Sequence, residues 1–170
     1  MLGELIYALE YRGEAVETMY TLENGDNKIT IPENLYIIGT MNTADRSVSH
    51  IDYAIKRRFA FVDVLPDEEP INNKNAKEIF KKVSDLFVKD KDGKKVNSEW
   101  LALDFNFKDV QLGHSYFILK DGTEEEQNSE LSIRLKYEIM PILREYVKDG
   151  LLLESDNLNK KLEDIENFDL

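Results

Sequence analysis

Apolar and polar positions follow two different patterns along this chain, and the pattern changes near residue 66. Before that point short apolar runs alternate with turns, and the runs Leu35 to Ile38 and Phe59 to Leu65 stand out. Beyond it apolar residues recur at three- and four-residue spacing, which is the period of an amphipathic helix. The pattern predicts an α/β part over residues 1–66 and a mainly helical part over residues 67–170.

The first elements predicted are a helix and a β-hairpin. Leu2 to Glu10 has its apolar residues at helical spacing. Two stretches of strand character, Ala15 to Leu22 and Lys28 to Ile31, flank the dipeptide Asn24-Gly25, which is a common two-residue hairpin turn. Pro32 ends the second strand, since proline cannot donate to a ladder.

The stretch from Asn34 to Leu65 organises the first part of the chain. The run Leu35 to Ile38 leads into a polar loop over residues 39–46, and a short amphipathic helix then leads into the run Phe59 to Leu65. Strand, loop, helix and strand in this order form the crossover unit of a parallel sheet. We therefore expect polar groups at the carboxyl end of a buried strand, where open α/β folds place their chemistry.

The helix between the two runs has a definite direction. At about 100° per residue, Ile51, Ile55 and Phe59 share one side, and Arg57 lies almost opposite them. Arg57 is therefore predicted to point toward solvent or another body, with Arg58 on the flank. A solvated helix end is the alternative, because cations are favoured at a helix C-terminus.

The second part is predicted to consist of helices joined by polar turns. Pro66 to Pro70 marks the boundary by its composition. A helical stripe of apolar residues runs from Ala76 to Phe87. Polar segments follow at Asp90 to Lys95, predicted as a turn, and at Asp121 to Asn128, predicted as an acidic turn or loop. A long helix over Ser129 to Lys148, bent at Pro141, and a final helix within Leu151 to Phe168 complete the prediction.

Composition excludes several classes of protein. The 170 residues contain no cysteine, which excludes disulfides and cysteine metal sites and fits a reducing cytoplasm. The two histidines give little support to a zinc site. No apolar run approaches the ~20 residues that span a membrane. The net charge of −12 repels nucleic acid overall, whereas the local excess of arginine and lysine between Thr40 and Val62 suits a compact anion such as a nucleotide phosphate.

Two motifs carry a resemblance to a known family. The loop Gly39-Thr-Met-Asn-Thr-Ala-Asp-Arg46, followed by Ile51-Asp-Tyr-Ala-Ile-Lys-Arg-Arg-Phe59, resembles the McrB family. These proteins are the AAA+ GTPase subunits of methylcytosine-dependent restriction systems. The resemblance extends from Leu2 to about Val147. It implies the C-terminal part of an AAA+ P-loop NTPase module, with a partial parallel sheet and a β-hairpin insertion, followed by a helical lid.

The resemblance also implies roles for individual residues. Asn42 matches the sensor position that bonds the attacking water or the γ-phosphate, and an amide can do so without changing protonation. Thr43 lies beside it and is grouped with it in nucleotide binding. Asp45 completes the family's Asn-x-x-Asp pair. Arg57 and Arg58 match the arginine-finger region, where a guanidinium stabilises charge on the transferred phosphoryl group. Turn chemistry alone is the alternative for Asn42 and Asp45.

The family also implies partners and a cofactor. The expected cofactor is GTP, or ATP, with Mg²⁺, and the expected partners are further subunits in a hexameric ring and an McrC-like nuclease. DNA is contacted through other domains. The segment Gly113 to Phe117 resembles part of the family's lid, and for it we favour a structural interpretation, with a loop glycine, a hydrogen-bonded histidine and two core aromatics.

The elements that bind the phosphates and Mg²⁺ in such an NTPase are missing from these 170 residues. No G-x-x-x-x-G-K-[ST] phosphate loop occurs, and no strand before Asn34 ends in Asp-Glu. We therefore expect a C-terminal fragment that supplies sensor and finger residues, is inactive by itself and binds no nucleotide. A non-catalytic AAA+ interaction module and an ATP-dependent MoxR- or dynein-related remodelling protein are the alternatives.

Overall fold

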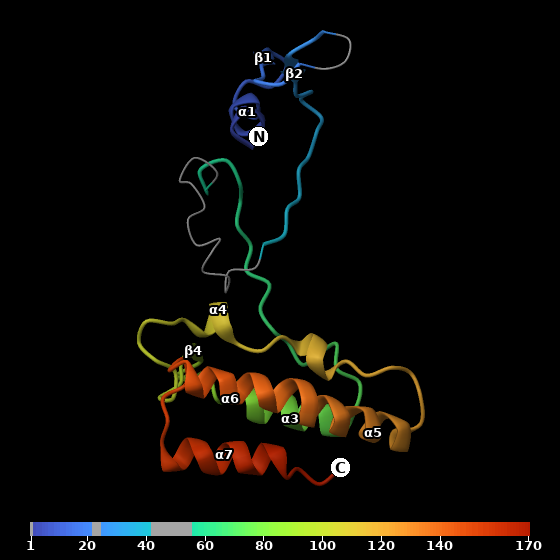
Figure 1. Ribbon diagram of the computed structural model, residues 1–170, viewed down its shortest axis with the longest axis vertical. Helices are drawn as coiled ribbons and strands as arrows, with labels where there is room; N and C mark the ends of the chain where they lie inside the picture. The colour runs from blue at the N-terminus through green and yellow to red at the C-terminus, as the bar shows by residue number, and fades with distance from the viewer. Residues whose placement is uncertain (1, 22–24, 42–55) are drawn as a thin grey trace. The chain divides into compact units, whose positions relative to one another are not determined.

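The computed structural model describes residues 2–21, 25–41 and 56–170 (Figure 1). The chain divides into two compact units, Met1–Val62 and Asp63–Leu170. The two units do not test the prediction that the domains are the α/β part and the lid of an AAA+ module.

The first unit contains a helix and an antiparallel pair of strands. Helix α1 spans Leu2–Ala8, strand β1 spans Ala15–Glu17 and strand β2 spans Lys28–Thr30. Val16 lies opposite Ile29 in the ladder, so the predicted hairpin is confirmed with shorter strands. Gly25 has a φ of +82°, a conformation that glycine adopts without a steric penalty.

The predicted parallel strands are not formed. Leu35 to Ile38 and Phe59 to Leu65 belong to no strand, and the side chains of Tyr36 and Ile38 are 89% and 94% exposed. A parallel strand needs hydrogen-bonded neighbours and cover on its faces. The described residues of this unit supply only the antiparallel pair β1–β2. The Leu35 carbonyl accepts instead from Arg12 Nη1 at 2.6 Å, and the predicted parallel sheet is not formed by the described residues of this chain.

The second unit is mainly helical, as predicted, and has a continuous core. Helices from distant parts of the sequence lie side by side in it (Figure 1). Phe80 packs edge-on against Phe117 at 5.3 Å between ring centroids, and Phe87 against Tyr146 at 6.0 Å. The elements are α3 (Lys74–Ser84), β3 (Val88–Lys91), β4 (Lys94–Asn97), α4 (Phe107–Val110), the 3₁₀ turn η1 (His114–Phe117), α5 (Glu124–Arg134), the π turn η2 (Leu135–Ile139), α6 (Met140–Lys148) and α7 (Asp156–Glu166).

The hairpin β3–β4 replaces the simple polar turn predicted over Asp90 to Lys95. The two strands pair from Val88 opposite Asn97 to Lys91 opposite Lys94. The turn itself is where it was expected, and both central residues, Asp92 and Gly93, have positive φ. Asp-Gly between two strands is a strong signal for this turn. The hairpin was not predicted because the residues on either side of the turn are mostly lysine and aspartate, which do not give the apolar pattern of a strand.

The long helix starts earlier than predicted. Asp121 to Asn128 was expected to be a turn or loop, but α5 begins at Glu124. Thr123 caps it: its hydroxyl accepts from the Glu126 N–H at 3.3 Å, and the Glu126 carboxylate accepts from the Thr123 N–H at 2.8 Å. This reciprocal capping box satisfies two donors that a helix start would otherwise leave unpaired. The sequence signal was the Thr-x-x-Glu spacing.

The helix continues past a proline through a π turn. The Met140 N–H donates to the carbonyl of Leu135, five residues back. Pro141 has no N–H, and in a regular α-helix its ring would clash with the carbonyl of Tyr137. The wider turn directly before Pro141 relieves this clash, and α5 and α6 follow one another as one long rod (Figure 1). The final helix, α7, buries Leu158, Leu162 and Ile165 as predicted. None of the described helices is both long and apolar enough to cross a membrane.

We predict that Thr123→Ala lowers the unfolding free energy of the helical unit by about 1 kcal/mol, because it removes the cap of α5. Thr123→Ser keeps the hydroxyl and should retain most of the stability. Urea unfolding followed by circular dichroism measures both variants. Equal losses in the two would contradict the capping role.

Candidate functional site

The polar loop lies outside the described residues. Asn42, Thr43 and Asp45 belong to the range 42–55, so their predicted roles stay predictions. Of the predicted site residues, the structure describes Arg57 and Arg58, which follow the helical residue Lys56.

The two arginines differ in their surroundings. Arg57 is exposed, as the helical angles predicted. The side chain of Arg58 is only 13% exposed, and its Nη2 lies 2.5 Å from Oε1 of Glu10. Glu10 lies shortly after the end of α1, so this ion pair ties Arg58 to the first helix. An arginine held in this way supports the fold, whereas Arg57 has its guanidinium available to another molecule.

The first unit also has an open hollow beside α1. It is lined by Gly3, Glu4, Tyr7, Tyr11, Glu14, Ala15, Val16, Glu17 and Met19. Three of these residues are glutamates, which repel a phosphate group, and no lysine or arginine lines the hollow. Its chemistry is therefore wrong for the phosphates of a nucleotide.

The segment Gly113 to Phe117 is built into the helical unit. Phe117 is fully buried, and Nδ1 of His114 accepts from the Asp67 N–H at 3.2 Å. Tyr116 packs against the same core. The structural interpretation, with a hydrogen-bonded histidine and two core aromatics, is confirmed.

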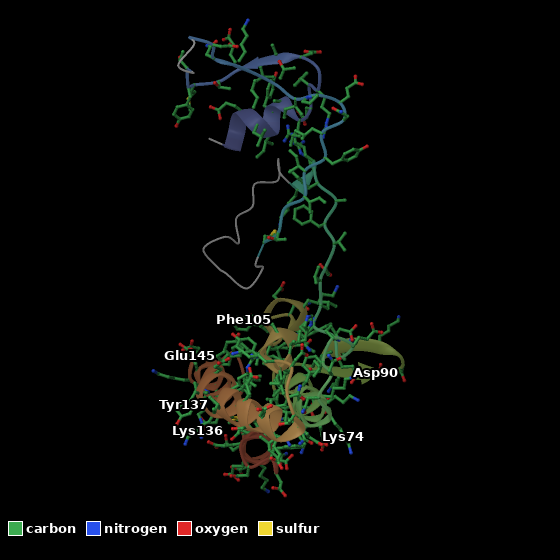
Figure 2. All side chains as sticks on the ribbon, turned by 90° about the vertical axis from the view of Figure 1, so that its right-hand side faces the viewer. Lys74, Asp90, Phe105, Lys136, Tyr137 and Glu145 are labelled. Atoms are coloured by element: carbon green, nitrogen blue, oxygen red, sulfur yellow. The ribbon has the colours of Figure 1, made fainter. Side chains whose placement is uncertain are left out.

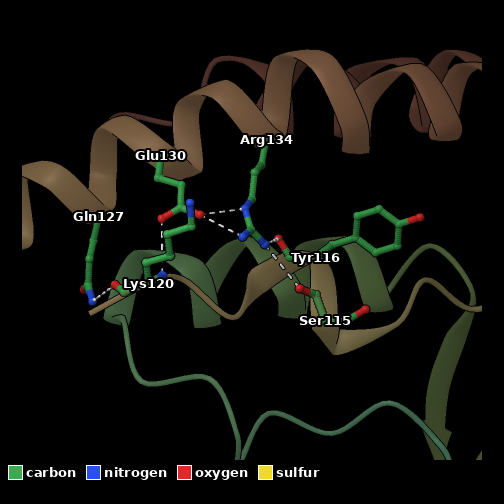
Figure 3. A network of polar contacts seen from close by, with 6 residues as sticks. All are labelled: Ser115, Tyr116, Lys120, Gln127, Glu130 and Arg134. Atoms are coloured by element: carbon green, nitrogen blue, oxygen red, sulfur yellow. Dashed lines mark hydrogen bonds and ion pairs between the residues drawn. The ribbon is translucent and has the colours of Figure 1, made fainter. Parts of the chain in front are cut away.

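Arg134 holds this segment against α5 (Figure 3). Its Nη1 donates to the carbonyls of Ser115 and Tyr116, both at 3.3 Å. Its Nη2 and Nε donate to Oε1 of Glu130 at 2.7 and 3.1 Å. One planar guanidinium therefore joins two backbone carbonyls to a carboxylate, a geometry that a lysine cannot reproduce.

Glu130 extends the network to the next segment. Its Oε2 accepts from the Lys120 N–H at 3.2 Å, and the Lys120 carbonyl accepts from Gln127 at 3.0 Å (Figure 3). The Lys120 N–H first, and the Arg134 guanidinium after it, hold the pKa of Glu130 below its ordinary value. The network thus fixes residues 115–120 along α5. Sequence reasoning missed it, because Glu130 and Arg134 look like an ordinary surface pair four residues apart.

No cluster of metal-ligating side chains occurs within the described ranges. The second unit is therefore a helical domain with a single core, a capped long helix and a 3₁₀ turn that is held in place by Arg134. Residues 94–152 match the family model described as the alpha-helical lid domain of McrB.

The chain belongs to the McrB family. It is 36% identical over 177 aligned positions to the type IV methyl-directed restriction enzyme EcoKMcrB subunit of Escherichia coli strain K12. The alignment covers 96% of this chain and 37% of that relative, so the chain spans little more than a third of the relative's length. No solved structure matches the chain. The predicted family is confirmed.

We predict that Arg134→Ala lowers the unfolding free energy of the helical unit by about 1–2 kcal/mol, because Glu130 and two carbonyls lose a charged donor. Arg134→Lys should recover only part of the loss. Arg144→Ala is the control, since Arg144 pairs with Glu166 at the exposed surface, where ion pairs contribute little. Urea unfolding measures all three, and a loss for Arg144→Ala equal to that for Arg134→Ala would contradict the network's importance.

The lowered pKa of Glu130 predicts a pH dependence. A carboxylate with a lowered folded-state pKa stabilises the fold above its unfolded pKa of about 4.3, and the gain is lost as the pH falls through the folded value. Glu130→Gln should therefore reduce stability at neutral pH and flatten the acid limb of the stability curve. Thermal unfolding between neutral and acid pH measures this. An unchanged acid limb in the variant would contradict the shift.

Proposed function

We propose that this chain is the sensor, arginine-finger and lid portion of a nucleotide-hydrolysing AAA+ subunit in a methyl-directed restriction system. The observation that carries the proposal is the polar motif Gly39 to Arg46 with the triplet Lys56-Arg57-Arg58, in a chain whose residues 94–152 match the McrB lid domain. The relative from E. coli is itself a methyl-directed restriction enzyme subunit. GTP is the proposed nucleotide, with ATP as the alternative, and Mg²⁺ would accompany either.

The exposed runs fit a place in a larger sheet. Leu35 to Ile38 and Phe59 to Leu65 carry apolar side chains such as Ile38 and Val62 in solvent. We use "complete subunit" for a longer protein that contains this chain. In the AAA+ module that we propose, these runs are parallel strands that lie between further strands of the complete subunit. The polar loop with Asn42, Thr43 and Asp45 then follows the carboxyl end of the first strand, where α/β folds bind their ligands.

The different surroundings of the two arginines suggest different roles. Arg57, exposed and without the Glu10 anchor, is the proposed finger that reaches the nucleotide of a neighbouring subunit. Arg58 is proposed to position Arg57 by fixing the turn after Lys56 to Glu10, next to α1. An AAA+ ring and an McrC-like nuclease partner belong to the same proposal, as does contact with methylated DNA through other domains of the complete subunit.

A non-catalytic interaction module is the second candidate. The observation in its favour is the lack of a phosphate loop in the 170 residues. The two candidates differ in one respect: only the first requires that these residues change the rate of hydrolysis in a complete subunit.

We predict that Arg57→Ala in a complete subunit lowers kcat by about 10³-fold or more, with little change in nucleotide Kd, because a finger acts on the transition state. Arg58→Ala and Glu10→Gln should resemble each other, since each breaks the same ion pair, with reduced stability. Steady-state hydrolysis and equilibrium nucleotide binding measure these effects. A large loss of binding with normal turnover in Arg57→Ala would contradict the finger role.

We predict that this chain by itself binds neither labelled GTP nor ATP in the presence of Mg²⁺, because a phosphate loop is needed to hold the triphosphate. Equilibrium dialysis measures the binding directly. A complete subunit is the positive control. Tight binding by the chain itself would mean that it contains a phosphate site other than the expected loop.

A further inference from the structure

The β3–β4 hairpin separates its charges by face. Residues directly opposite each other in an antiparallel pair share a face, and faces alternate along each strand. Lys91 lies opposite Lys94, and Lys89 lies opposite Val96. These three lysines therefore share one face. Asp90 lies opposite Lys95, and this pair belongs to the other face.

The lysine face is the outer one. Val88 packs against the core of the helical unit. Asn97, opposite Val88, donates to the Phe105 carbonyl at 2.8 Å and accepts from the Phe107 N–H at 3.0 Å. The face that carries Val88 and Asn97 is thus turned toward the protein. Lys89, Lys91 and Lys94 are exposed and belong to the opposite face. Figure 2 shows Asp90, which lies between Lys89 and Lys91 in the sequence, at the margin of the helical unit.

The tip of the hairpin is held in a defined geometry. Asp92 and Gly93 have φ of 56° and 76°, and Oδ1 of Asp90 accepts from the Gly93 N–H at 2.9 Å. This turn keeps Lys91 and Lys94 directly opposite each other. Like charges in that arrangement destabilise a strand pair. In the part of the chain that the structure describes, Lys89 pairs with Glu99 at 2.9 Å, and no acidic residue forms an ion pair with Lys91 or Lys94.

We propose that this outer lysine face binds the phosphate backbone of duplex nucleic acid, without reading its sequence. A lysine ammonium binds phosphate as a point charge. Protein–protein interfaces are depleted in lysine and rely on aromatic and apolar anchors, and single-strand sites rely on aromatic side chains that stack on bases. Apart from the half-buried Val96, the outer face carries no apolar or aromatic side chain, so its exposed lysines are best suited to a duplex backbone.

The net charge of −12 led to the opposite expectation, but that value averages over the whole chain. At physiological ionic strength the Debye length is about 8 Å, so distant carboxylates are largely screened from the hairpin. The hairpin itself has four lysines against two aspartates. This inference goes beyond the proposed nucleotide chemistry and does not depend on it.

The test measures binding of this chain to a fluorescent duplex DNA by anisotropy, without nucleotide, between about 20 and 200 mM salt. Each phosphate neutralised contributes about −0.9 to the slope of log K against log salt concentration. Lys91→Gln combined with Lys94→Gln should therefore make the slope less steep by about 1.8 and weaken binding at low salt. DNA of unrelated sequence should bind equally well.

The matched control is Lys136→Gln combined with Lys160→Gln, which removes the same charge from exposed positions on η2 and α7. It should leave the slope unchanged, and circular dichroism should show that both double variants remain folded. No binding of DNA by the unmodified chain at low salt, or an equal change of slope in both double variants, would overturn the proposal. Binding of poly-glutamate by the hairpin with no binding of DNA would also overturn it, in favour of an acidic protein partner.

Discussion

The fold depends on whether each apolar segment is buried against other described residues of the chain. In the helical unit it does: α3, η1, α6 and α7 bury one continuous core, with Phe87 and Phe117 fully inside. Burial of each such side chain contributes about 1.5–3 kcal/mol, so the unit has a driving force of its own. In the first unit only Ala8 and Ile31 are buried among the described residues. Most side chains of the two apolar runs remain in solvent, among them Ile38, Val62 and Val64.

This difference connects the fold to the proposed function. In the proposed function the helical unit acts as a lid that keeps its shape, and its core and the Arg134 network hold its segments together. The proposed sensor and finger positions belong instead to segments next to the uncovered apolar runs. Their chemistry depends on precise placement, because catalytic groups act within a few tenths of an ångström of their required positions. The proposed function therefore requires the complete sheet.

The helices could be predicted from the sequence because their apolar periodicity is local. The final helix with Leu158 is found as expected, and the stripe from Ala76 to Val83 lies on α3, which ends at Ser84, before Leu86 and Phe87. The β3–β4 hairpin, the early start of α5 and the Arg134 network were missed, since each depends on a turn or on partners distant in sequence. The parallel strands were predicted from an apolar pattern that is real, but pairing needs neighbours, and a pattern within one segment does not provide them. Of the candidate site, the outward direction of Arg57 could be predicted, whereas the anchoring of Arg58 by Glu10 could not.

In a complete subunit we expect the two apolar runs to become strands of a nucleotide-binding sheet. Amide hydrogen exchange, read by mass spectrometry, measures this directly at residues 35–41 and 59–65, with α3 and α6 as internal references. We predict fast exchange of both runs in this chain and slow exchange in the complete subunit, while the helices are protected in both. Fast exchange of the runs in the complete subunit, or protection already present in this chain, would contradict it.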